Sequence, residues 1–375
     1  MEGAFVTVET FIEKYTFLYK FPPVFGKPLG KNAKRKFTQF GVASVLNIGY
    51  VVAIVLVLHV GYTDKLEVGL VVMFAQIMFL MEAVTSLWCD YALFFSWEEM
   101  NWISRELRRL VTSTRGPPTK KSKTNTWLVS LATHQFVSTY QNVALVWLGV
   151  VLTTFIGLKY DTAFYLIQML APRQSGWEWS LSGKLVRSSF SAYFGYLQVI
   201  GTSTMSLLGL EFVYYASKIL EQMNRQPVTG GKIAYNSIAL LIQRINQIIA
   251  WPMTVAIAGA SVIFICAFNA SVKRYEGLPQ ILTPAFVALA LGMAILAGQA
   301  LNSGAGVLVN SSDWLDTYKV DEEGNKNRKY FERECRSLQP VSLICGGFGE
   351  ISKVTMLNLY AVWLDQSVSV LLAFA

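Results

Sequence analysis

The chain contains 375 residues, of which 53% are hydrophobic and only 15% are charged, and its mean hydropathy is +0.40. Soluble domains carry about 25% charged residues, so this composition excludes an ordinary soluble domain and is typical of a polytopic membrane protein. The formal net charge of +8 is explained by basic loops on one side of a membrane, so it requires no nucleic-acid partner.

Seven segments are apolar enough, over about 20 residues, to cross a bilayer as helices. The predicted spans are residues 39–62, 66–95, 136–158, 188–213, 248–270, 281–301 and 354–373. The fold class is therefore all-α, with a cytoplasmic segment at 1–38 followed by a seven-helix transmembrane domain at 39–373.

Three of the connecting segments, 96–135, 214–247 and 302–353, are predicted to carry the neighbouring spans onward as cytoplasmic helical extensions. In WEEMNWISRELRRLVTS, residues 97–113, apolar positions recur at helical spacing between arginines, which indicates an amphipathic helix continuing the second span. Such extensions could pack on one another or on neighbouring subunits. Periodicity gives equal weight to ordinary helices on the membrane surface.

The distribution of basic residues predicts the orientation of the spans. With seven spans, 25 of the 32 Lys and Arg residues fall on the side of the N-terminus and 7 on the other. Basic residues concentrate in short cytoplasmic loops, so the N-terminus is predicted to be cytoplasmic and the C-terminus extracellular. A G-protein-coupled receptor has the opposite orientation, and the chain also lacks D-R-Y after the third span and N-P-x-x-Y in the seventh.

Enzyme motifs are absent from the sequence. There is no Walker loop, H-E-x-x-H, dinucleotide-binding glycine turn or nucleophile elbow. The two histidines lie far apart and the four cysteines have no C-x-x-C spacing, so no metal site and no cofactor are predicted. The chain is not expected to be an enzyme.

The last span contains an unusual polar pair, Asp365 and Gln366, within an apolar helix. Polar groups at bilayer depth are costly and commonly face water, a partner or a pore. At helical spacing Trp363, Gln366 and Val370 share one face, so copies of this helix around an axis would form a polar ring and an apolar constriction, with Asp365 on the adjacent face. Alternatively, the pair forms hydrogen bonds between helices of one subunit.

The spacing from Tyr360 to Gln366 resembles the signature of gustatory receptors in the insect chemoreceptor superfamily, T-Y, five mostly apolar residues and Q-F. This chain has Leu359 and Ser367 in place of the flanking Thr and Phe. The segment FERECRSLQPVSLICGGFGEISKVTMLNLYAVWLDQSVSVLLAF is similar to the C-terminal region of that superfamily, and LLIQRINQIIAWPM is similar to the segment before its fifth span.

The resemblance implies a chemosensory receptor of the plasma membrane that is a tetrameric, ligand-gated, non-selective cation channel, a homo- or hetero-tetramer surrounded by membrane lipid. Its last helix would line the pore, with Trp363, Asp365, Gln366 and Val370 as the candidate pore residues. A metabotropic seven-helix receptor and a membrane transporter remain as alternatives, although no internal duplication typical of transporters is visible.

The same resemblance implies a small organic ligand in the outer half of each subunit. The aromatic and polar residues at that depth are Phe74, Phe155, Tyr193, Tyr196, Gln198 and Phe286. An apolar site with a few polar groups suits such a ligand. Glu82, near the middle of the second span, either lines the floor of this site or pairs with another helix.

Overall fold

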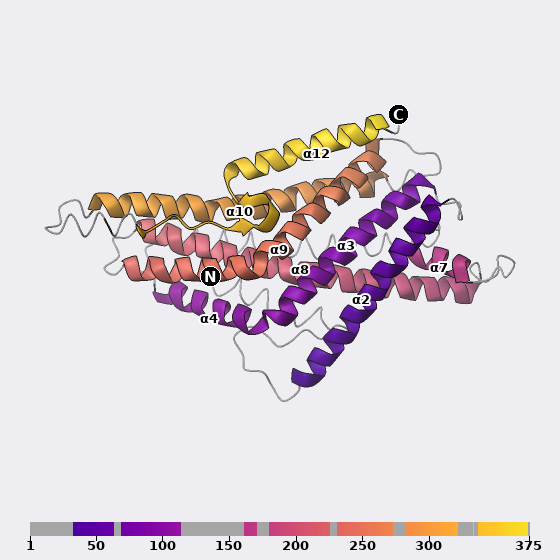
Figure 1. Cartoon of the computed structure of the whole chain (residues 1–375), viewed down its shortest axis with the longest axis horizontal. Helices are drawn as coiled ribbons and strands as arrows, with labels where there is room; N and C mark the ends of the chain where they lie inside the picture. Colours follow the sequence, from indigo (N-terminus) through magenta and orange to yellow (C-terminus); the bar gives the residue numbers. More distant parts are fainter. Residues whose placement is uncertain are drawn as a thin grey trace.

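The computed structural model describes residues 33–63, 69–113, 161–170, 180–225, 231–272, 283–321, 333 and 337–373. Within these ranges the protein is all-α, apart from one two-stranded hairpin near the end of the chain. The helices are α2 (Ala33–Tyr62), α3 (Leu70–Phe95), α4 (Trp97–Ser113), α7 (Thr162–Leu170), α8 (Leu181–Arg225), α9 (Gly231–Val272), α10 (Thr283–Asp321) and α12 (Lys353–Ala373). Helices α8 and α10 run along the long axis of the molecule, whereas α2 and α3 cross it obliquely (Figure 1).

Five helices among the described residues are long and apolar enough to cross a membrane, namely α2, α3, α9, α10 and α12. They coincide with five of the predicted spans. The predicted fourth span, 188–213, lies within α8, whose polar residues keep it outside that group of five. The predicted third span, 136–158, and most of the segment 1–38 lie outside the described residues. The protein is therefore an all-α, multi-pass membrane protein.

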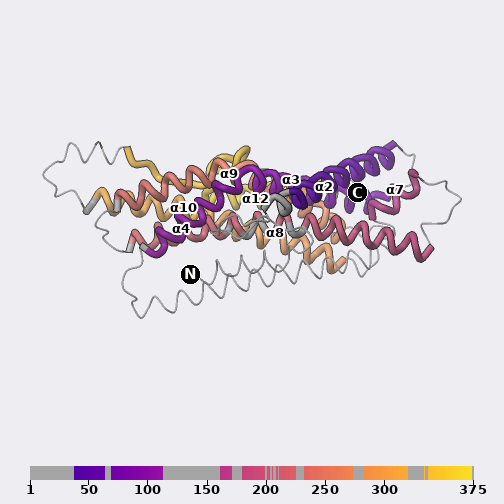
Figure 2. Tube along the Cα trace, turned by 90° about the horizontal axis from the view of Figure 1, so that it is seen from below, coloured from indigo at the N-terminus to yellow at the C-terminus, as the bar shows by residue number. Residues whose placement is uncertain are grey.

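Most described residues of the predicted extensions are helical, but residues 338–350 of the segment 302–353 form an extended stretch and a hairpin instead. Helix α8 continues through residues 214–225, α9 begins 17 residues before its predicted span, and α10 continues to Asp321. These ends gather with α4 at the end of the molecule opposite α7 (Figures 1 and 2). In the segment 96–135 the structure differs from the predicted continuation of the second span, because α3 ends at Phe95 and Ser96 makes a bend before α4 begins.

Apolar side chains hold this extension bundle together. Helix α4 buries Met100, Ile103 and Leu107 completely. Tyr235 of α9 stacks on Trp314 of α10 with ring centroids 4.4 Å apart. Burying apolar side chains of this size contributes about 1.5–3 kcal/mol each relative to exposure, so the interior of the bundle, more than its surface charges, stabilises it.

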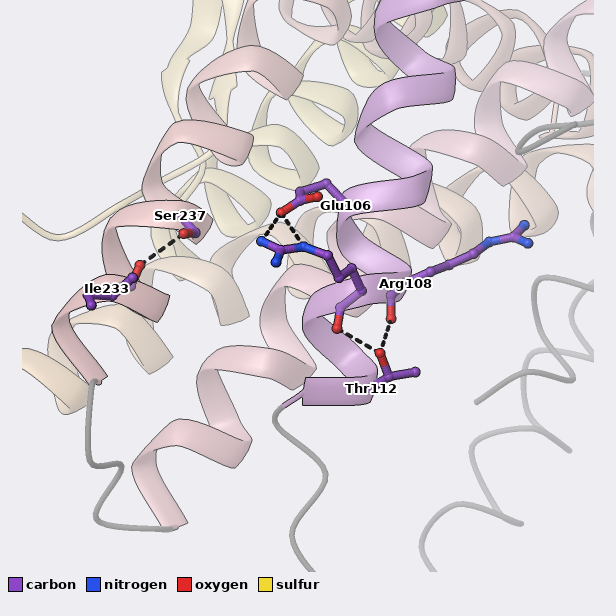
Figure 3. A network of polar contacts seen from close by, with 6 residues as sticks. Glu106, Arg108, Thr112, Ile233 and Ser237 are labelled. Carbon is purple, nitrogen blue, oxygen red and sulfur yellow. Dashed lines mark hydrogen bonds and ion pairs between the residues drawn. The ribbon is translucent and has the colours of Figure 1, made fainter. Parts of the chain in front are cut away.

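Polar groups on the outside of the bundle bond mostly within their own helices. In α4, Arg109 pairs with Glu106, and the Thr112 hydroxyl donates to the carbonyl of Arg108 at 3.2 Å. On the neighbouring α9, Ser237 donates to the carbonyl of Ile233 at 2.9 Å, and Figure 3 shows both sets of bonds remaining on separate helices. The hydrogen bond and charge of Glu106 raise the pKa of the exposed Arg109 guanidinium.

A short extended segment connects the bundle to α12. The Tyr235 hydroxyl donates to the carbonyl of Gln339 at 2.8 Å. The Asn246 amide donates to the carbonyl of Ser342 at 2.9 Å and accepts from the amide of Ile344 at 3.0 Å. Side chains of α9 thus supply hydrogen-bond partners to backbone groups of this segment that are not paired within a helix or a strand.

A tight hairpin then reverses the chain into α12. Strand β1 (Ile344–Cys345) pairs antiparallel with β2 (Gly349–Glu350) around the 3-10 turn η4 (Gly346–Phe348). Gly349 has a φ of 76°, a conformation that favours glycine. Gly346 lies against α9, where an added Cβ would come within 2.6 Å of the Thr254 hydroxyl. The sequence GGFGE therefore forms a turn that packs against α9 and leads the chain into α12.

Candidate functional site

One face of α12 is buried against its own chain. Leu359, Trp363 and Ser367 are buried, and the Trp363 side chain is only 1% exposed. Its indole Nε1 donates to the Ser261 hydroxyl on α9 at 2.6 Å, and its ring stacks on Phe264 with centroids 4.6 Å apart. Trp363 is therefore the main anchor between α12 and α9.

A second anchor joins α12 to α10. The Tyr360 hydroxyl donates to the backbone carbonyl of Ala294 at 2.8 Å. It passes close to Gly298, where an added Cβ would lie only 2.4 Å from the tyrosine oxygen. Glycine at 298 thus permits the approach of the two helices, and α12 is attached to both α9 and α10.

The four candidate pore residues differ in their exposure in the structure. Trp363 points into its own subunit, whereas Gln366, three residues later, is exposed. Asp365 and Gln366 are exposed on the surface of the chain, and Val370 is half-buried against a second core cluster. The large indole of Trp363 packs against α9, and Gln366 lies at the exposed edge of the same helical stripe.

The exposed surface of α12 has a polar arc and an apolar arc. The polar arc contains Asn358, Asp365 and Ser369, with Gln366 at its edge, and all four side chains are exposed. The apolar arc contains the exposed Val354, Leu357, Leu364, Val368 and Leu372. One further exposed apolar side chain, Val362, lies between Ser369 and Gln366. Asn358 was missed from the sequence, although its position one heptad before Asp365 places it on the same face.

The predicted ligand-binding residues lie in two different clusters. Phe74 of α3 and Phe286 of α10 are buried in one apolar cluster, which also includes Phe164 of α7. Tyr193 and Tyr196 of α8 pack against the larger cluster instead. Gln198 is buried on α8, and Phe155 lies outside the described residues. The structure thus brings Phe74 and Phe286 together but does not join them to the two tyrosines.

A buried polar network at the α7 end was missed by the sequence reasoning. Asp161 and Arg187 form an ion pair whose side chains are almost fully buried, with the Arg187 Nε donating to Asp161 Oδ1 at 3.2 Å. The Thr162 hydroxyl donates to Gln76 Oε1 at 2.8 Å and lies 3.3 Å from the hydroxyl of Tyr50. These contacts join α7 to α2, α3 and α8.

The Arg187 guanidinium also lies over the ring of Phe164, 4.8 Å from its centroid. Cation–π contact and the ion pair together hold α7 over the apolar cluster that contains Phe74. Arg187 directly precedes the predicted span 188–213, so its sequence position indicated a loop residue. The signal available in the sequence was a basic residue directly before an apolar span. The sequence alone does not identify its acidic partner, because Asp161 lies 26 residues away and meets Arg187 only in the folded chain.

Asn269, the first residue of an N-x-S sequon, is completely buried, and its amide donates to the carbonyl of Ile265 at 2.8 Å. A glycan cannot be accommodated there in this conformation. Among the described residues, no group of three or more His, Cys, Asp or Glu side chains could hold a metal ion.

Comparison with known proteins gives a likeness of fold. No protein-family model and no curated protein sequence matches the chain. The solved structures that match include the insect olfactory receptor OR5 from Machilis hrabei in complex with eugenol, with a TM-score of 0.66 and 10% sequence identity over 99% of this chain and 100% of that chain. A second structure of that receptor matches with a TM-score of 0.65 and 11% identity over 98% and 99% of the two chains. The chain therefore has the fold of an insect olfactory receptor.

Proposed function

We propose that the protein is a chemosensory receptor that acts as a ligand-gated, non-selective cation channel of the plasma membrane. The observation that carries this proposal is the polar arc of Asn358, Asp365 and Ser369 on the exposed side of an otherwise apolar helix. In a lipid environment such an arc is expensive unless it faces water or another polar surface. A water-filled axis surrounded by copies of α12 satisfies that requirement.

In this arrangement several subunits, four by the resemblance, place their copies of α12 around one axis. The Asp365 carboxylates and Gln366 amides form polar rings that favour cations, and the apolar arc faces lipid or a neighbouring helix. Val370, half-buried at the edge of the polar arc, can narrow the pathway. Trp363 takes no part in the lining, because it anchors α12 to its own subunit.

The two anchors suggest how ligand binding reaches the pore. The apolar cluster of Phe74 and Phe286 involves α3, α7, α9 and α10, and it also contacts Val370 of α12. A small organic ligand there that prefers one arrangement of α9 and α10 would bias the position of α12 through Trp363 and Tyr360. The matching receptor from Machilis hrabei is described in complex with eugenol, which supports a ligand of this general class.

The orientation of the chain is part of the proposal. With the N-terminus in the cytosol, the extension bundle of α4, α8, α9 and α10 lies below the membrane and the α7 network lies near the outer surface. Antibody access to tags at each terminus of intact cells tests this directly. Staining of an N-terminal tag without permeabilisation would contradict the orientation and would favour a metabotropic seven-helix receptor.

The pore assignment is tested by substituting the charged and polar residues of α12. Currents of the variants are recorded under voltage clamp, with a panel of small volatile and sapid compounds as ligands. Asp365→Asn and Gln366→Ala are expected to change cation selectivity or single-channel conductance, because they alter groups that face the ions. Leu364→Ala, on the apolar arc, is the matched control and should leave selectivity unchanged.

Currents that persist in cells without G-protein signalling are required for a channel. If Asp365→Asn and Gln366→Ala both conduct with the selectivity and conductance of the unmodified protein, α12 does not line the pathway.

A further inference from the structure

Three helices bring polar side chains to one level inside the membrane-spanning region. The α2–α3–α8 polar cluster consists of Ser44, Asn47, Ser86, Asp90 and Gln198. On α2 the two contributing positions are three residues apart and on α3 they are four apart, so each pair lies on one face of its helix; Gln198 is the contribution of α8. Four of the five side chains are buried, and Ser44 is half-buried. This cluster lies on helices other than α12 and away from the apolar cluster assigned to the organic ligand.

Interatomic distances show that the α3 side chains contact both α2 and α8. The Ser44 hydroxyl lies 3.5 Å from Asp90 Oδ2. On the other side, a Cβ added to Gly201 of α8 would lie 2.6 Å from the Ser86 hydroxyl and 3.1 Å from Asp90 Oδ1. Two oxygen atoms therefore converge on a position of α8 that has no side chain.

The remaining members are placed at the same level by their neighbours. Tyr50 of α2 stacks on Phe194 of α8 with centroids 4.5 Å apart. Asn47 lies one turn from Tyr50, and Gln198 lies one turn from Phe194 toward Gly201. Both amide side chains thus lie between the aromatic stack and the glycine.

Several polar atoms in this cluster have no hydrogen-bond partner among the described residues. These are Oδ1 and Nδ2 of Asn47, the hydroxyl of Ser86 and Nε2 of Gln198. Buried polar atoms in native proteins are almost always paired, with protein groups or with bound water or ions. Here the unpaired atoms come from α2, α3 and α8 and lie beside the Asp90 carboxylate. Their arrangement therefore indicates a binding site for a polar ligand.

We propose that the α2–α3–α8 polar cluster binds a monovalent metal cation together with water. The Asp90 carboxylate, the hydroxyls of Ser44 and Ser86 and the amide oxygen of Asn47 are hard oxygen ligands of the kind that alkali and alkaline-earth ions prefer. A single carboxylate supplies one negative charge, which matches a monovalent ion. Water coordinated to the ion accepts hydrogen bonds from the amide groups of Asn47 and Gln198.

Binding at this cluster would link α2, α3 and α8 and stabilise the arrangement in which Gly201 lies against Ser86. Any rearrangement that separates α8 from α3 would weaken binding, so the ion favours one conformation of the receptor. The site does not depend on whether α12 lines a pore, and its test does not require channel activity.

The experiment measures thermal unfolding of the purified full chain in detergent, in sodium chloride, potassium chloride or choline chloride at equal ionic strength. We expect the unfolding midpoint to rise by about 2 °C or more in sodium or potassium relative to choline, with saturation as the salt concentration increases. Asp90→Asn should abolish the rise because it removes the charge. Gly201→Ala should abolish it without removing a ligand atom, because the added Cβ occupies the space of the Ser86 and Asp90 oxygens.

Thr85→Ala is the matched control. Thr85 is the neighbour of Ser86 on α3, but its hydroxyl donates to the carbonyl of Met81 at 2.7 Å and faces Gly259 of α9. This variant should keep the cation-dependent rise. If Asp90→Asn does not fold, Ser86→Ala replaces it and should shift the half-saturating salt concentration about tenfold higher, since one ligand is lost. Equal midpoints in all three salts would overturn the proposal. So would a rise that persists in Gly201→Ala, or a half-saturating salt concentration in Ser86→Ala equal to that of the unmodified protein.

Discussion

The anchor between Trp363 and Ser261 offers the sharpest test of how α12 is held. Trp363→Phe keeps an aromatic ring over Phe264 but removes the indole donor of the 2.6 Å hydrogen bond. The Ser261 hydroxyl still donates to the carbonyl of Ile257 at 2.7 Å, so only its role as an acceptor is lost. A hydrogen bond between membrane helices contributes on average about 0.6 kcal/mol, and one in a soluble protein contributes about 1 kcal/mol.

If this bond transmits ligand binding from α9 to α12, its loss reduces the coupling free energy by the same amount. The ligand concentration for half-maximal current should then rise about three- to fivefold. Because the smaller ring also leaves space in the core, the bond is isolated by a double-mutant cycle with Ser261→Ala. The second change should have little further effect once the first is present.

The assay is a concentration–response curve under voltage clamp, with thermal unfolding of the purified variants alongside it. Trp88→Phe, on α3 and partly exposed, is the matched control and should leave both measurements unchanged. Effects of Trp363→Phe and Ser261→Ala that simply add would refute the reasoning, because the two side chains would then act independently.

Three further predictions concern packing. Arg187→Met should destabilise the protein by about 3–5 kcal/mol, because it leaves Asp161 as a buried charge, and Asp161→Asn in the same chain should recover much of this loss in a thermal unfolding measurement. Gly298→Ala should lower the unfolding midpoint, since its Cβ would meet the Tyr360 hydroxyl at 2.4 Å; Tyr360→Phe in the same chain should relieve the clash, and a midpoint unaffected by Gly298→Ala would contradict the close packing of α10 and α12. Leu107→Ala in α4 should cost about 2–5 kcal/mol because Leu107 is completely buried in the extension bundle, whereas Trp102→Ala, which is exposed, should cost much less by the same measurement.

Much of the architecture could be predicted because the bilayer imposes a simple rule on the chain. A run of about 20 apolar residues must form a helix to satisfy its backbone, so α2, α3, α9, α10 and α12 follow from composition alone. The periodic apolar residues of 97–113 likewise predicted α4 over the same residues that form it. The break at Ser96 was not predicted, since a bend of one residue leaves helical periodicity intact on both sides.

The candidate site was less predictable because the sequence alone does not define which face of a helix is buried. Spacing placed Trp363, Gln366 and Val370 on one stripe, but the tertiary structure turns Trp363 toward Ser261 and leaves Asp365 and Gln366 on the surface. The rotation depends on Ser261, Phe264 and Gly298, which belong to other helices, and no property of the last span specifies them.

What the sequence by itself determined is therefore the class of protein, the positions of most of its spans and the presence of a polar pair in the last one, because these depend on the local balance between side chains and lipid. Only the tertiary structure decided which polar groups meet. Asp161 finds Arg187, Ser44 lies beside Asp90, and Gly201 leaves room for Ser86. These contacts depend on how neighbouring helices are rotated and aligned, and that is settled by packing between residues far apart in the chain.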